Sequence, residues 1–255
     1  MRVAALSDVH GNLAALDAVL ADVIEAEVDT VVFTGDVALG PFPDPTLERL
    51  MELSLPARFV RGNCDRELVA AFDATPVEES LHDASWEAAV AWAAGRMSAE
   101  QRNFLARFEP SFTLTVDGLG PTLFCHATPR SDEEIVTPLT PPAVLEPILD
   151  GVPEATVVVG HTHTQFDLAV GRTRLVNPGS VGMPNADAPG AYWAVLGPDV
   201  MMRRSEYDVA AAAEAIDASG FPIPRFGEEH VLTVPGAAEA QARFEQMGVE
   251  RRSRS

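Results

Sequence analysis

The sequence contains no lysine, only two cysteines and no long apolar run. Cys64 and Cys125 are too few for a disulfide framework, so we expect two buried, inert thiols in a reducing compartment. No stretch approaches the roughly 20 apolar residues that span a bilayer, and the opening MRVAAL turns polar at Ser7, too early for a signal-peptide core. These absences predict a cytoplasmic protein with no membrane as a partner.

Positive charge is also scarce. The chain carries 38 acidic residues against 18 basic ones, all of them arginine, and its formal net charge is −20. Such a charge opposes binding to a nucleic-acid duplex or to an anionic membrane surface. An anionic substrate would therefore need a strong local positive charge where it binds.

The length and the order of patterns indicate an α/β protein. The 255 residues fit one large domain, so we predict a single domain over 1–255. Three β-branched runs, RVAALS, DTVVFTG and ARFVRG, alternate with helical patterns, which predicts parallel strands joined by helices. Asn12 is the expected N-cap of the first helix.

The rest of the chain changes character twice. A helical insertion is predicted at about 76–110, with Ser98 capping its second helix. The following half is rich in strands separated by turn residues, which predicts a second sheet packed on the first. A helical extension is predicted at about 206–255. We expect the insertion to govern substrate choice, because segments over a rigid rim commonly do so.

Polar side chains follow five of the predicted strands where each strand ends. The segments are LSDVHGN, FTGDVALG, VRGNCD, FCHATPR and VVVGHTHTQF. In open α/β sheets, ligands bind outside the carboxyl ends of the strands, so these segments should meet at one rim. The candidate residues are Asp8, His10, Asp36, Asn63, His126, His161 and His163.

These residue types point to divalent metals. Carboxylate oxygen, amide oxygen and imidazole nitrogen suit Mn, Fe, Co, Ni or Zn ions, unlike an all-oxygen calcium cage or a thiolate zinc site. Seven candidates exceed the needs of one tetrahedral ion and fit two ions that share a carboxylate. If the strand continued, His161 and His163 would share a face with Cα atoms about 6.5 Å apart, whereas paired catalytic metals lie about 3.5–4 Å apart. Each histidine could then serve a different ion.

Simpler interpretations exist for single residues. A lone histidine at a strand end is more often a capped or solvated side chain than a ligand. Asp8 and Asp36 could each form an ordinary turn after a strand, and Asn63 could be a left-handed turn residue. Asn177 in NPGS is interpreted as a turn former. The simpler interpretation fails for the set as a whole, because the candidates gather in five ordered segments.

The motifs DVH, GD, GNCD, CH and GHTH, in this order at strand ends, resemble the calcineurin-like metallophosphoesterase superfamily. The trailing NPGSVG resembles its small bacterial phosphodiesterase branch, and the resemblance spans residues 6 to about 183. It implies an α/β fold in which two sheets form a β-sandwich flanked by helices. It also implies a first ion held by Asp8, His10 and His163. The second ion would take Asn63, His126 and His161, with Asp36 bridging both.

The implied activity is that of a metal-dependent phosphoesterase, most simply a phosphodiesterase, in which a hydroxide bridging two metal ions attacks phosphorus. Asn63 and His126 would then act in catalysis. Arg66 and Arg130 stand beside ligand positions and are the expected contacts to substrate phosphate. The chain has GNCD where the superfamily's protein phosphatases have GNHE, so Asp65 is the available acid for the leaving group.

Two alternatives stay open. One is a hydrolase of nucleotides or dinucleoside polyphosphates, and the other is a catalytically silent protein-interaction module of the same fold. The arginine of the phosphatase motif GDxxDRG is missing from GDVALG, which disfavours a protein-phosphatase role. All seven ligand positions are present, which favours an enzyme. The expected partner is a small phosphate ester, and a homo-oligomer is compatible with the sequence.

Overall fold

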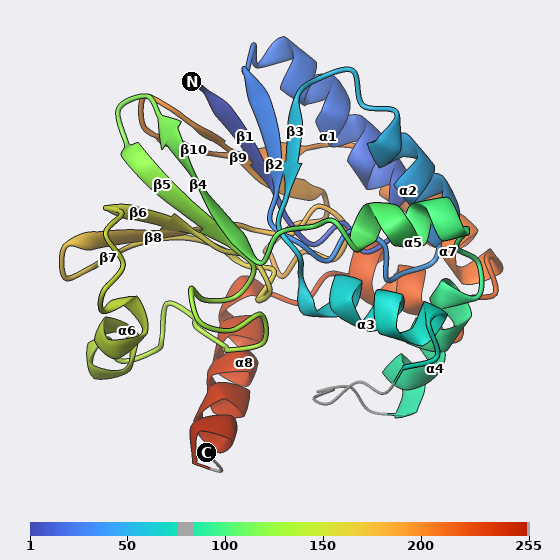
Figure 1. Ribbon diagram of the computed structural model, residues 1–255. Coiled ribbons are helices and arrows are strands. Elements are labelled where there is room, and N and C mark those ends of the chain that lie inside the picture. Colours follow the sequence, from blue (N-terminus) through green and yellow to red (C-terminus); the bar gives the residue numbers. More distant parts are fainter. Residues whose placement is uncertain (76–83, 254–255) are drawn as a thin grey trace.

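Two five-stranded sheets stack face to face in the computed structural model, which describes residues 1–75 and 84–253. Helices cover the outer sides of both sheets (Figure 1). The α/β sandwich predicted from the sequence is thus confirmed. Part of the predicted insertion, residues 76–83, lies outside the described residues.

The first sheet contains the three parallel strands expected near the start of the chain. Its order is β10-β9-β1-β2-β3, and β9 runs antiparallel to β1. We had expected β9 in the second sheet, and that expectation was wrong. Five of the six β9 residues are buried, so this strand suits an interior position in the first sheet, between β10 and β1. The strands are β1 (Val3–Leu6), β2 (Thr30–Phe33), β3 (Ala57–Phe59), β9 (Ala191–Leu196) and β10 (Val200–Ser205).

The second sheet has the order β4-β5-β6-β8-β7, with β5, β6 and β8 parallel and an antiparallel strand at each edge. All five of its strands fall on runs that the sequence marks as β. They are β4 (Ser111–Val116), β5 (Gly120–Cys125), β6 (Thr156–Val158), β7 (Gln165–Val170) and β8 (Thr173–Pro178).

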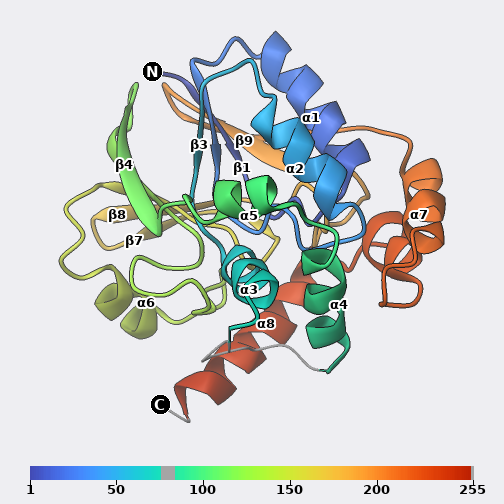
Figure 2. The ribbon, with the colours of Figure 1, turned by 45° about the vertical axis from the view of Figure 1, so that its right-hand side comes forward.

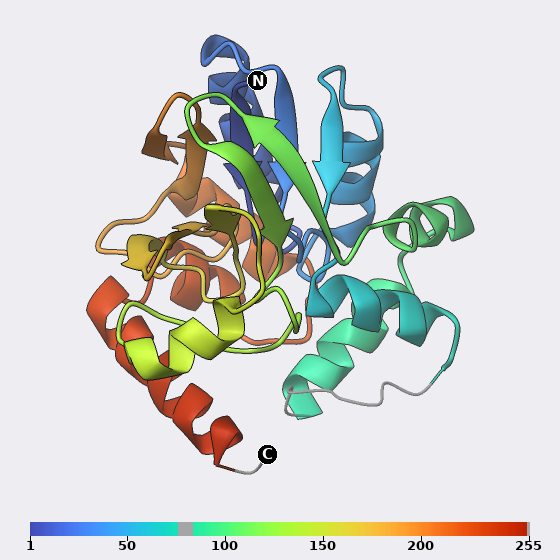
Figure 3. The ribbon, with the colours of Figure 1, turned by 60° about the vertical axis from the view of Figure 1, so that its left-hand side comes forward.

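The helices form the outer layers (Figure 2). Those on the side of the first sheet are α1 (Leu13–Glu25), α2 (Pro43–Met51), α3 (Asn63–Phe72), α4 (Ala84–Ala94), α5 (Ala99–Leu105) and α7 (Val209–Ala218). Helix α6 (Pro142–Leu149) packs on the second sheet. A short π-helix, η1 (Glu228–Leu232), precedes α8 (Ala237–Arg252), which crosses below both sheets in Figures 1 and 3.

Two predicted caps are confirmed. The Asn12 side chain accepts a hydrogen bond from the Ala15 backbone N–H at 3.2 Å and so begins α1. The Ser98 hydroxyl accepts a hydrogen bond from the Gln101 backbone N–H at 3.2 Å, and the Gln101 side-chain oxygen accepts one from the Ser98 backbone N–H. Each cap satisfies backbone donors that the first helical turn leaves without partners.

The core follows the alternation of side chains along the strands. In β1, Ala4 and Leu6 face the helices, whereas Val3 and Ala5 face the second sheet. Phe124 of β5 belongs to the layer between the sheets and is fully buried, and replacing it by alanine should cost about 3–5 kcal/mol. The packing on both faces of the first sheet holds the strand ends in fixed positions relative to one another.

In the described part of the chain, no helix is long and apolar enough to cross a membrane.

Candidate metal centre

All seven residues predicted as metal ligands lie at one end of the sandwich. Asp8 and His10 follow β1, and Asp36 follows β2. The remaining residues are Asn63 at the start of α3, His126 after β5, and His161 and His163 after β6. Both sheets therefore contribute, because the parallel strands of each sheet end at the same rim.

Asp8, His10 and His163 form a first cluster, in which one ligand atom of each residue lies within 4.8 Å of the others. The His10 and His163 Nε2 atoms are 3.1 Å apart, and His163 Nε2 is 3.4 Å from Asp8 Oδ1. The first trio predicted from the motifs is thus brought together.

Asp36, His126 and His161 form a second cluster of the same kind. Asn63 joins it, since its Oδ1 atom lies 3.2 Å from His126 Nε2. Asp36 Oδ2 lies 3.3 Å from His126 Nε2 and 3.9 Å from His10 Nε2. Asp36 therefore stands between the two clusters, as the motifs imply for a bridging carboxylate.

Backbone carbonyls contact the Nδ1 atoms of three imidazole rings and so orient these rings. His10 Nδ1 contacts the Leu39 carbonyl at 3.0 Å, and His126 Nδ1 contacts that of Thr34 at 2.7 Å. His163 Nδ1 contacts the Met183 carbonyl at 2.9 Å. A proton on Nδ1 in each contact leaves Nε2 directed at the cluster with a free lone pair, and metal-binding histidines usually donate their other ring N–H to a carbonyl or carboxylate in this way.

Five of the seven candidates have left-handed backbones. Their φ angles are +54° for Asp8, +47° for His10, +56° for Asp36, +68° for His161 and +59° for His163. Each such residue costs of order 1–3 kcal/mol when it is not glycine, and such residues concentrate at functional sites. The sharp turns aim the side chains into the space between the strand ends.

The local geometry of the histidine pair differs from our expectation. Strand β6 ends at Val158, so His161 and His163 lie in a turn and the strand-based spacing argument does not apply. The pair still divides between the clusters, because the turn sends His163 toward Asp8 and His161 toward Asp36.

Two asparagines hold this turn in place. Asn177 donates to the Gly160 carbonyl at 2.7 Å, and its own Oδ1 accepts from the Gly179 N–H at 2.8 Å. Asn185 donates to the Thr162 carbonyl at 3.0 Å. The turn role predicted for Asn177 is confirmed, and the same side chain also fixes the loop that carries both histidines.

Close approaches require glycine at two positions. A Cβ atom on Gly62 would lie 2.0 Å from Asp36 Oδ1, and one on Gly160 would lie 1.9 Å from Ser7 Oγ and 2.9 Å from Asp8 Oδ2. Neither neighbour is the end of a long, flexible side chain. These glycines make room for the two carboxylates.

The charges in the clusters suit cations. Burial acts to raise the pKa of Asp8, but the neighbouring His163 outweighs it and the pKa is lowered. Asp36 behaves in the same way, because His126 holds its pKa well below the usual range against the effect of burial. Burial and then His126 lower the pKa of His161 to about 3. Two buried carboxylates are thus anionic, and neutral imidazole is available beside them.

The donor set fits divalent ions. Asp8 Oδ1 is fully buried and, apart from the 3.4 Å approach of His163 Nε2, has no polar partner among the described residues; a carboxylate oxygen in that state is costly unless a cation satisfies it. The mixture of carboxylate, amide and imidazole atoms suits borderline ions of the manganese to zinc series. Both clusters could therefore hold a metal ion.

Asp65 does not take the place expected of an acid. Its Oδ2 accepts from the Asp36 and Gly62 N–H groups at 2.9 Å each, and its Oδ1 accepts from the Val37 N–H at 3.0 Å. Asp65 is fully buried. Burial and then the charge of Asp36 raise its pKa to about 7. Because both oxygens are turned into the backbone, the geometry argues for a positioning residue that ties the Asp36 loop to α3.

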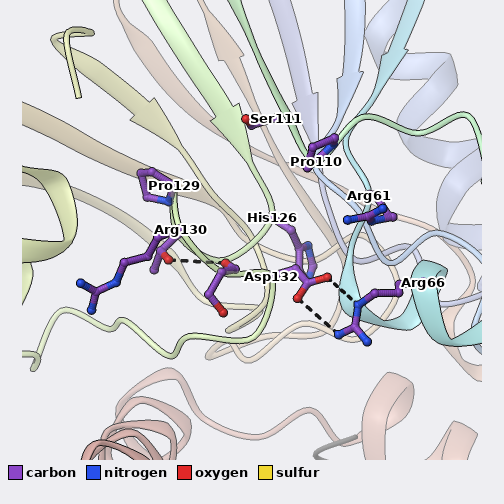
Figure 4. A pocket seen from close by; sticks show the side chains of 10 residues that line it. Arg61, Arg66, Pro110, Ser111, His126, Pro129, Arg130 and Asp132 are labelled. Atoms are coloured by element: carbon purple, nitrogen blue, oxygen red, sulfur yellow. Dashed lines mark hydrogen bonds and ion pairs between the residues drawn. The ribbon is translucent and has the colours of Figure 1, made fainter. Parts of the chain in front are cut away.

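The two predicted substrate arginines line a cavity of about 490 Å³ that also reaches His126 (Figure 4). Arg66 contacts Asp132 at 2.9 Å and Glu133 at 2.5 Å. Arg130 pairs with Glu134 at 2.5 Å, is 55% exposed, and extends away from His126. Both charges are thus neutralised by carboxylates, which the sequence could not indicate.

A second cavity, of about 420 Å³, opens over the clusters themselves. Its lining includes five of the seven candidate ligands, all except Asp8 and His126. The opposite wall comes from residues that we had not assigned to the site: Trp86, His230, Arg243, Phe244, Met247 and Arg251. Four of these belong to α8, whereas Trp86 is the sole contribution among the described residues of the predicted insertion.

Nothing in the motifs marks that wall. Trp86 is half-buried and packs against the core, and its ring centroid lies 6.5 Å from that of His10. The exposed apolar residues of α8, such as Met247 at 37% and Val249 at 53%, are evident only in the structure, so the sequence offers no signal for this wall.

A model of the calcineurin-like phosphoesterase superfamily domain matches residues 1–197. The elements from β10 through α8 follow this matched region. The centre therefore lies within the matched region, but most of the wall facing it does not.

Relatives of similar length were also found. The uncharacterised protein MJ0912 of Methanocaldococcus jannaschii is 27% identical over 241 residues, which are 86% of this chain and 93% of that protein. A metallophosphoesterase structure from Sphaerobacter thermophilus has a TM-score of 0.67 at 26% identity, covering 87% of this chain and 95% of the other. The hypothetical protein PH1004 of Pyrococcus horikoshii has a TM-score of 0.74 at 22% identity, covering 87% and 94%, and shares the fold.

Proposed function

The chain belongs to the calcineurin-like phosphoesterase superfamily and is a phosphoric ester hydrolase, and we propose that it hydrolyses phosphodiesters at the paired clusters. The observation that carries this proposal is the position of Asp36, whose Oδ2 lies within 3.9 Å of imidazole nitrogens from both clusters. One carboxylate shared by two nitrogen-rich clusters is the arrangement that a binuclear hydrolase needs.

We assign the ligands by cluster. Asp8, His10 and His163 would hold one ion, and Asn63, His126 and His161 would hold the other. Asp36 would contact both. Two divalent ions of the manganese, iron, cobalt, nickel or zinc type would lower the pKa of bound water toward neutrality and polarise a phosphoryl oxygen.

The surrounding residues position this centre. The carbonyls of Leu39, Thr34 and Met183 orient three rings, so that the Nε2 atoms need not reorganise when substrate binds. Asp65 holds the Asp36 backbone and the first residues of α3 in one unit. Asp8 Oδ2 accepts from the His161 N–H at 3.1 Å, which joins the loops of the two clusters.

The cavity wall favours a diester with an apolar or aromatic substituent. Trp86, Phe244 and Met247 supply apolar surface opposite the clusters, and Arg243 and Arg251 supply positive charge. In a chain of net charge −20, this local cationic character would offset repulsion of an anionic phosphate. With both carboxylate oxygens turned into the backbone, Asp65 would not protonate the leaving group, which favours substrates with good leaving groups.

A second candidate function is hydrolysis of nucleotides or dinucleoside polyphosphates. The arginine-lined cavity beside His126 favours it, because such substrates carry more than one phosphate. A catalytically silent interaction module is disfavoured, since all seven ligand positions are present and drawn together.

The purified protein should cleave bis-p-nitrophenyl phosphate when Mn²⁺ or Ni²⁺ is added and lose this activity on chelation. Elemental analysis should find about two transition-metal ions per chain. Absence of turnover across these metals and several pH values would reject the proposal. Turnover that survives complete chelation would reject the assigned role of the clusters.

A further inference from the structure

The cavity beside His126 contains a cation that the metal centre does not explain. Arg61 lies between β3 and α3, and it lines this cavity together with Arg66 and His126. Figure 4 shows the Arg61 side chain directed toward His126, at the inner end of the cavity. No motif of the sequence singles out Arg61.

Among the residues that the structure describes, no carboxylate pairs with Arg61, unlike its neighbours Arg66 and Arg130. Its Nε atom is buried and has no hydrogen-bond partner among these residues, and a buried donor in that state costs about 1–3 kcal/mol. The Arg61 backbone N–H donates to the Glu109 carbonyl at 2.7 Å, but the Glu109 carboxylate pairs with Arg58 at 2.5 Å. The Glu109 carboxylate is thus engaged by Arg58, and only the backbone of Glu109 contacts Arg61.

The other two arginines of the cavity differ in this respect. Asp132 and Glu133 neutralise Arg66, and Glu134 neutralises Arg130. Among the described arginines of this chain with 38 acidic residues, a buried Nε without a partner occurs at Arg61, in this cavity, and at Arg2, outside it. An anionic ligand entering the cavity would supply the missing acceptor, and a phosphate group matches the fork of donors on a guanidinium.

We propose that this cavity binds a second phosphate group of the substrate, with Arg61 as its principal contact. The inference rests on the proposed function, because the first phosphate would lie at the paired clusters. His126 belongs to the second cluster and also lines this cavity, so the two phosphates would be neighbours. The substrate class is then a phosphate ester with a second phosphate next to the scissile one, as in nucleoside diphosphate esters and dinucleoside polyphosphates.

Binding to the metal-free protein tests the subsite without any turnover. Inorganic pyrophosphate should bind the chelated wild type by calorimetry, and Arg61→Gln should weaken this binding at least 10-fold. Arg61→Lys keeps the charge but not the fork and should fall between the two. Arg49→Gln is the matched control, since it removes an equal charge from an arginine paired with Asp17 outside both cavities, and it should bind as the wild type does.

Equal pyrophosphate binding by Arg61→Gln and the wild type would overturn the inference. These results hold whether or not the enzyme turns over, so they are distinct from a failure of the proposed function. Thermal unfolding of each variant verifies that it is folded.

Kinetics on the metal-loaded enzyme test the substrate class. The ratio of kcat/KM for diadenosine triphosphate to that for bis-p-nitrophenyl phosphate should fall at least 10-fold in Arg61→Gln, mainly through KM. An equal fall for both substrates would place Arg61 in support of the centre and would contradict the second-phosphate subsite. Wild-type inactivity toward both substrates would instead reject the proposed function.

Discussion

The Nε2 atoms of His10 and His163 lie 3.1 Å apart, although the Nδ1 atom of each ring faces a backbone carbonyl. With protons on both Nδ1 atoms, two lone pairs would face each other and repel unless a cation lay between them. Burial acts to lower the pKa of His163, yet Asp8 outweighs it and the pKa is raised. A proton can thus occupy this position, and a divalent ion would satisfy both rings and Asp8 together.

Metal binding should stabilise the fold. Because the clusters exist only in the folded chain, Mn²⁺ at 100 times its Kd should add about 2.7 kcal/mol per site to the free energy of unfolding. Thermal unfolding with increasing Mn²⁺ measures this effect, and chelator should reverse it. A midpoint temperature of unfolding that does not change with the Mn²⁺ concentration would contradict the assignment of both clusters.

Removing a proposed metal ligand should abolish most activity. Asp36→Asn and His126→Ala should each lower kcat/KM for bis-p-nitrophenyl phosphate by two or more orders of magnitude, roughly 3 kcal/mol or more of transition-state stabilisation. Asp17→Asn changes a half-exposed carboxylate on α1 and is the control. Near-wild-type rates for either site variant in metal-replete buffer would refute its role.

The two roles of Asp65 make different predictions. As a positioning residue, Asp65→Asn would turn an amide donor toward backbone donors and destabilise the fold by about 1–3 kcal/mol. Metal affinity should fall as well, and rates should drop by a similar factor for good and poor leaving groups. A stable variant that loses activity only toward poor leaving groups would restore the role of general acid.

Gly160 should not tolerate a side chain. In Gly160→Ala the new methyl group would lie 1.9 Å from Ser7 Oγ, so the loop carrying His161 must move. We expect a stability loss of about 1–3 kcal/mol and weaker metal binding. Gly236→Ala is the control, because its Cβ would meet nothing within 4 Å. Similar metal affinity in both variants would show that the close approach does not position the centre.

Helix α8 should affect substrate binding more than chemistry. Phe244→Ala removes apolar surface from the cavity wall and should raise KM for bis-p-nitrophenyl phosphate about 10-fold, equivalent to about 1.4 kcal/mol, with kcat changed less. Val249→Ala truncates an exposed residue of the same helix outside the cavity lining and should have no such effect. Equal KM values for Phe244→Ala and Val249→Ala would show that the cavity-lining face of α8 does not contribute to substrate binding.

The sequence was most informative where chemistry and topology coincide. Asp8, Asp36 and His126 could be found because parallel strands deliver polar residues to one rim, whatever the details of the turns. The backbone at His161 and His163 could not be predicted, because a regular strand was assumed and the left-handed φ angles depend on anchors such as Asn177.

Contacts between segments far apart along the chain could not be predicted from the sequence. The partners of Arg66 and Arg130 decide whether each charge is available, and the partners of Arg66 lie more than 60 residues away along the chain. The placement of β9 depends on pairing with β1, almost 200 residues earlier. Local patterns identify the elements but carry no information about such pairings.

The position of α8 after the matched region matters for inference among relatives. Chains that share every motif through residue 197 can end in different helices, so they can possess the same hydrolytic centre and yet act on different compounds. Transferring a substrate from one relative to another is then justified by the residues that correspond to Arg243 and Phe244, and not by the ligands alone. Families of this kind would be better subdivided by their carboxyl-terminal helices than by their motifs.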